Sequence, residues 1–120
     1  MTHPIHAADE LPDEAVMQLV DRLFDRWQLD EQTRRRLLSI GQDSSVAGNG
    51  GSSAALVRAR QLLTIHAGLR CLFPDDPELR WNWVTMRNKS LDGSTPLAVM
   101  VSEHHGTSRI LQLVWREVAT

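Results

Sequence analysis

Residues 54–73 read AALVRARQLLTIHAGLRCLF, and this stretch predicts one long helix. Ser52 or Ser53 can cap its first turn, and Pro74 ends it. The apolar surface of this helix is supplied by Leu56, Leu62, Leu63, Ile65, Leu69, Leu72 and Phe73.

Two shorter helices are predicted before it. Pro12 and the acids that follow suit a first helical turn. Asp30 is a good N-cap for a second helix over residues 31–40, which Gly41 ends. The apolar stripe of the first helix, spaced at three and four residues, is Val16, Leu19, Val20, Leu23, Phe24 and Trp27.

Three further helices are predicted after residue 74. Asp76 followed by Pro77 starts a short helix that carries Leu79, Trp81, Trp83 and Val84. Thr95 followed by Pro96 starts the next helix, and Thr107 or Ser108 caps the last one. Because no segment alternates as a strand does, we predict an all-α fold, a compact helical bundle.

The chain divides into four parts by composition. Residues 1–11 are polar and are predicted to be a disordered N-terminus. Residues 12–43 form a short helical unit, and residues 44–53, rich in Gly and Ser, form a flexible loop. Residues 54–120 form the C-terminal helical domain.

Composition limits the function classes. The 120 residues carry a formal net charge of -2, which argues against a dedicated nucleic-acid binder. Cys71 is the single cysteine, so no disulfide forms within the chain, which suits the cytoplasm. The apolar runs are far shorter than the ~20 residues of a membrane helix, and residues 1–10 have no apolar core typical of a signal peptide.

The turn between the predicted helices carries the most informative motif. Residues 83–100 read WVTMRNKSLDGSTPLAVM. Asn88 can bond nearby backbone and shape a turn. Gly93 is expected to take a left-handed conformation or to let two backbones approach, and Pro96 presets the next helix. Trp83 buries a large ring and offers one hydrogen-bond donor.

This motif resembles the Xre/MbcA/ParS antitoxin family. The resemblance extends from about Leu56 to Val118 and includes the Ile65-His66 pair, then Trp83, Asn88, Gly93 and the Pro96-Leu97 pair in order. Arg87 stands where the family commonly has proline. Members usually place a helix-turn-helix before this domain, and residues 12–43 resemble a shortened, degenerate form of it.

The resemblance implies a cytoplasmic, non-enzymatic antitoxin without a cofactor. Such proteins bind a RES-domain toxin that consumes NAD, cover its active site, and form homodimers or hetero-oligomers. The toxin-binding residues implied here are Trp83, Arg87, Asn88, Lys89, Trp115 and Arg116. Tryptophan and arginine are the residue types most enriched in interface hot spots.

Two other functions remain open. A dimeric DNA-binding regulator would use Arg34, Arg35 and Arg36 on phosphates, although a solvated helix face balanced by Asp30 and Glu31 explains them better. The second open function is that of a solitary antitoxin-like domain that binds another protein partner. DNA remains a possible partner, but residues 44–53 lack the side chains that read bases.

No metal or catalytic site is predicted. His104 and His105 are adjacent and are expected to point to different sides of a turn, and His66 is expected to be packed. Cys71 is expected to be a small buried apolar residue. Trp27 and Trp83 are expected in the core, whereas at least one of Trp81 and Trp83 is expected to be partly exposed.

Overall fold

The computed structural model describes residues 11–39 and 49–120, and every regular element in them is helical, as predicted. The α-helices are α1 (Asp13–Arg26), α2 (Glu31–Ser39), α3 (Asn49–Leu72), α4 (Pro77–Asn82), α5 (Pro96–Ser102) and α6 (Gly106–Ala119). Two 3-10 turns, η2 (Trp83–Thr85) and η3 (Lys89–Leu91), connect α4 to α5.

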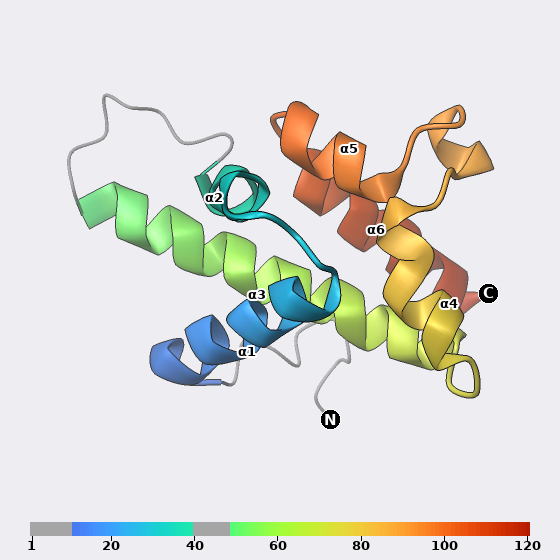
Figure 1. Ribbon diagram of the computed structural model, residues 1–120, viewed down its shortest axis with the longest axis horizontal. Coiled ribbons are helices and arrows are strands. Elements are labelled where there is room, and N and C mark those ends of the chain that lie inside the picture. Colours follow the sequence, from blue (N-terminus) through green and yellow to red (C-terminus); the bar gives the residue numbers. More distant parts are fainter. Residues whose placement is uncertain (1–10, 40–48) are drawn as a thin grey trace.

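Helix α3 is the axis of the molecule. It packs most extensively against α6, and α1 and α2 pack against it as well. Figure 1 shows α1 and α2 on opposite sides of α3, α5 near α2, and α6 running along α3 from α5 toward α4 at the end of α3. The connector that carries η2 and η3 lies on the side of α5 and α4 that is away from α2.

One continuous core joins these helices. Its fully buried side chains include Phe24 of α1, Leu37 of α2, Ile65 of α3, Met100 of α5 and Val114 of α6. Trp27 belongs to this core, as predicted.

Leu19 of α1 is more exposed than the other residues of its apolar stripe and keeps 39% of its surface exposed. At 3.6 residues per turn Leu19 falls at the edge of the stripe that Val16, Leu23 and Trp27 define, so it only borders the core.

Three of the predicted N-caps are confirmed by side-chain hydrogen bonds. Asp30 accepts from the Thr33 amide at 2.7 Å, Asp76 from the Leu79 amide at 3.1 Å and Thr95 from the Ala98 amide at 3.1 Å. Pro77 and Pro96 occupy the first turns of α4 and α5. Local sequence signals therefore set the starts of three helices.

Three helix boundaries differ from the prediction. Helix α6 begins at Gly106 with His105 at its N-cap, so neither Thr107 nor Ser108 caps it. Helix α3 begins at Asn49, within the predicted loop over residues 44–53 and earlier than the predicted Ala54. Extending a formed helix adds a hydrogen bond for each residue ordered, which offsets the poor propensity of glycine. Trp83 and Val84 do not continue α4 but form the 3-10 turn η2. Residues 1–10 and 40–48 lie outside the described residues.

Helix α3 is long enough to raise the question of a membrane span, with 24 residues. Arg58, Arg60 and Arg70 interrupt its apolar positions. Among the described residues no helix combines the length and the apolar character that crossing a bilayer requires.

Candidate protein-binding surface

Asn88 organises the connector between α4 and α5. Its side-chain oxygen accepts a hydrogen bond from the Ser90 amide at 2.9 Å. Its own amide donates to the Ser94 carbonyl at 3.0 Å, and its carbonyl accepts from the amides of Leu91 and Gly93, each at 3.0 Å. The predicted role of Asn88 in shaping this turn is therefore confirmed.

Gly93 closes the same turn. Its φ of +86° lies in the left-handed region, and a Cβ added there would meet nothing. Of the two explanations that the sequence allowed, backbone conformation is thus correct and close approach is not. Leu91 is 4% exposed and anchors the turn in the core.

A hollow of about 350 Å³ lies beside this turn. It forms where the end of α3, the turns η2 and η3, and the last turns of α6 meet. Apolar and polar side chains both line it: Leu72, Phe73, Trp83, Asn88, Ser90, Leu113 and Glu117. The structure thus brings Trp83 and Asn88, two of the predicted binding residues, to one concave site. Trp83 was expected in the core but is only partly buried, because it forms a wall of this hollow.

Exposed residues lie next to Trp83 and Asn88 in the connector. Met86, between Trp83 and Asn88, keeps 44% of its surface exposed. Arg87 and Lys89 flank Asn88 and are also exposed, and neither forms an ion pair with any described residue. We call Trp83, Met86, Arg87, Asn88 and Lys89 the connector surface.

Trp115 lies elsewhere. Its indole Nε1 donates to the Thr64 carbonyl of α3 at 2.9 Å. On α6, Leu113 and Glu117 line the hollow, and a residue two positions from each points away from them. Trp115 therefore ties α6 to α3 and does not line the hollow, and Arg116 is exposed on α6.

The close approach of α6 to α3 depends on Gly68, a residue not predicted to matter from the sequence. A Cβ at Gly68 would lie 2.4 Å from Val114 Cγ1 and 3.1 Å from Trp115 Nε1. An isolated glycine inside a helical pattern was the available signal, since it often marks a packing requirement.

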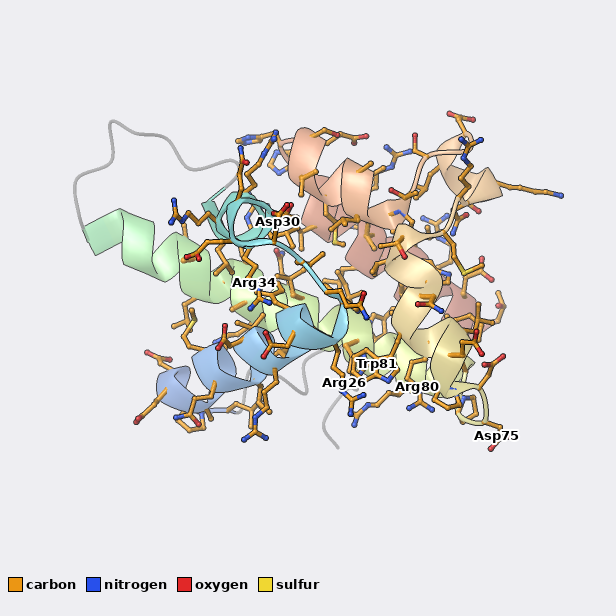
Figure 2. The ribbon with its side chains drawn as sticks, in the orientation of Figure 1. Arg26, Asp30, Arg34, Asp75, Arg80 and Trp81 are labelled. Atoms are coloured by element: carbon orange, nitrogen blue, oxygen red, sulfur yellow. The ribbon has the colours of Figure 1, made fainter. Side chains whose placement is uncertain are left out.

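The three predicted DNA-contacting arginines differ in their surroundings. Arg34 bonds Asp25 at 2.8 Å, the Leu29 carbonyl at 2.9 Å and Asp21 at 3.5 Å, so it fastens α2 to α1. Figure 2 shows Arg34 reaching from α2 toward α1. Arg35 lies 3.4 Å from Glu31 one turn earlier, and Arg36 is exposed.

His66 is packed, as predicted, against an aromatic ring. Its imidazole stacks on Trp81, with ring centroids 4.4 Å apart. Its Nδ1 is buried and bonds to no described residue. Burial, and to a smaller degree the positive charges of Arg70 and Arg80, lower the pKa of His66 from 6.5 to about 4. Trp81 is partly exposed.

Two predictions about reactive side chains are wrong. His104 and His105 do not point apart: their ring centroids are 4.3 Å apart in an edge-to-face contact, because the turn before α6 lets both rings fold to one side. Cys71 is exposed, not buried, since it lies next to Arg70 on the outer face at the end of α3. Residues 11–39 and 49–120 contain no group of three or more potential metal ligands.

Comparisons of the chain with protein-family models, with curated proteins and with solved structures found no match.

Proposed function

We propose that this protein is a non-enzymatic binding protein of the antitoxin kind, which binds a RES-domain NAD-consuming toxin and covers its active site. The connector surface and the hollow beside it would form the contact. The toxin's identity as the partner rests on the resemblance of residues 83–96 to the antitoxin signature.

The hollow is the observation that carries the proposal. Partner-binding sites combine a concave, largely apolar centre with an aromatic anchor and a polar rim. Leu72, Phe73, Trp83 and Leu113 supply the apolar walls, and Asn88 holds the rim in one conformation through its backbone bonds. A side chain of the partner would enter the hollow and be held between α3 and α6.

The charges around the hollow favour an acidic partner surface. Arg87 and Lys89 project on either side of Asn88 and are not neutralised by any carboxylate of the described residues. Charges at the rim of an interface mainly set orientation and association rate. Inhibition would then be steric, because a covered entrance excludes NAD.

Protein binding accounts for more of the structure than DNA binding does. Arg34 is occupied by Asp25 and Asp21, and Arg35 by Glu31, so two of three candidate arginines serve contacts within the chain. Part of the segment expected to replace the recognition helix lies outside the described residues. A gel shift on the DNA upstream of the gene would favour the regulator; its absence favours the pure binder.

The deciding experiment is neutralisation of the purified RES-domain product of the adjacent reading frame. We expect added wild-type chain to stop NAD loss at equimolar ratio. The Arg87→Glu/Lys89→Glu variant should fail to do so, because both side chains are exposed and the fold does not depend on them. Arg36→Glu, on α2, is the control and should still neutralise. Undiminished NAD loss with the wild-type chain would refute the proposal.

A further inference from the structure

A second cationic surface lies where α1, α3 and α4 meet, beside the stacked rings of His66 and Trp81. The guanidinium carbon of Arg26, at the end of α1, lies 5.2 Å from the centre of the Trp81 ring. His66 of α3 stacks on the same ring, and Arg70 follows His66 by one helical turn. Arg80 precedes Trp81 on α4, and Figure 2 shows Arg26, Trp81 and Arg80 together at this junction.

Two guanidiniums of this junction are held in place, and no carboxylate of the described residues neutralises them. Trp81 holds Arg26, and Arg80 donates from Nε and Nη2 to the Phe73 carbonyl at 3.2 and 3.0 Å. Within the described part of the chain no carboxylate pairs with Arg26, Arg70 or Arg80. Arg26 and Arg80 thus present two fixed positive charges at this junction, and the exposed Arg70 adds a third from α3.

We propose that this Arg26–Arg70–Arg80 surface binds a short acidic segment of a partner protein, with carboxylates pairing to the guanidiniums. A guanidinium presents parallel N–H donors that match a carboxylate, and a preorganised guanidinium loses little entropy on binding. Arg80 uses Nε and Nη2 for its bonds to the chain, and its Nη1 bonds to no described residue and is thus available to the ligand. This inference does not depend on the proposed function.

Two observations favour a short acidic peptide over a nucleic acid. The Trp81 ring already contacts His66 and Arg26, whereas single-stranded nucleic acids need aromatic faces on which bases stack. The turn before α4 carries Asp75 and Asp76, the first turn of α4 carries Glu78, and Figure 2 shows Asp75 beyond Arg80. These acids would repel a long polyanion that continued past the arginines.

Fluorescence anisotropy with a fluorescein-labelled oligoglutamate peptide tests the proposal. The full chain should bind the peptide, and Arg26→Glu and Arg70→Glu should each weaken binding about tenfold, since each replaces a favourable contact by repulsion. Arg36→Glu makes the same charge change on α2 and should weaken binding less than about twofold. Far-UV circular dichroism should show all three variants folded, because these side chains are exposed.

Three results would overturn the inference: no binding by the wild-type chain, equal weakening by Arg36→Glu, or tighter binding of an oligothymidylate of equal charge. If a charge reversal proves unfolded, Arg26→Gln and Arg70→Gln replace it. The neutral variants should also weaken binding, and unchanged affinity in both would equally refute the acidic-segment site.

Discussion

The indole of Trp115 on α6 donates its hydrogen bond to the Thr64 carbonyl on α3 at 2.9 Å. Gly68, one turn further along α3, leaves the space that this ring and Val114 occupy. The two helices that form one wall of the hollow are therefore fixed by a polar bond and by a missing side chain. Trp115 thus keeps α3 and α6 in place beside the hollow without lining it.

Trp115→Phe should lower stability without removing the surface. The variant loses the indole donor and some buried area, and we expect a loss of about 1–2 kcal/mol in the free energy of unfolding. Urea denaturation followed by circular dichroism measures it. Affinity for the toxin should fall far less than for Arg87→Glu. An unchanged urea midpoint would show that the bond to Thr64 contributes nothing.

Alanine substitution at two glycines should have unequal effects. A Cβ at Gly106 would lie 2.1 Å from the Val99 carbonyl oxygen, a backbone atom that cannot move aside without shifting α5. We expect Gly106→Ala to cost about 3 kcal/mol or more by overpacking, and Gly93→Ala about 1 kcal/mol by its left-handed φ alone. Thermal denaturation of both variants gives the order. A reversed order would contradict the packing of α5 on α6.

Arg34→Ala should destabilise the chain, whereas Arg35→Ala should not. Arg34 is half-buried and fastens α2 to α1 through Asp25 and the Leu29 carbonyl, so its loss should cost about 1–1.5 kcal/mol. Arg35 makes an exposed pair with Glu31 one turn away, and its loss should cost less than about 0.5 kcal/mol. Equal urea midpoints for the two variants would argue that Arg34 is held for an external ligand instead.

Stability should fall as the pH is lowered from about 6.5 to about 4 because of His66. Its pKa is lower in the folded chain, so the unfolded chain binds more protons in this window and acid favours unfolding. With its partial exposure discounted, the loss should be about 1–2 kcal/mol. His66→Gln removes the titrating group, and its urea midpoint should depend less on pH. A parallel pH dependence in both chains would assign the effect to carboxylates.

The sequence was informative where local chemistry decides the structure. Asp30, Asp76 and Thr95 cap helices as their side chains and the following residues predict. Asn88 and Gly93 shape their turn because their backbone preferences are local too. The all-α class followed from apolar residues spaced at three and four and from the lack of strand-like alternation.

Contacts between helices could not be predicted from the sequence. The resemblance placed Trp115 among the binding residues, but which face of α6 meets α3 depends on the small volume of Gly68. The pairing of Arg34 with Asp21 and Asp25 depends on how α2 crosses α1. The stack of His66 on Trp81 joins residues from different helices. No local rule specifies such contacts.

An NMR titration of the isotope-labelled chain with the unlabelled RES-domain product tests most directly where the partner sits. We predict that the largest amide shifts and line broadening fall on residues 83–90 and on α6 near Leu113 and Glu117, with little change on α2. Changes centred on α1 and α2, with residues 83–90 unmoved, would contradict the account.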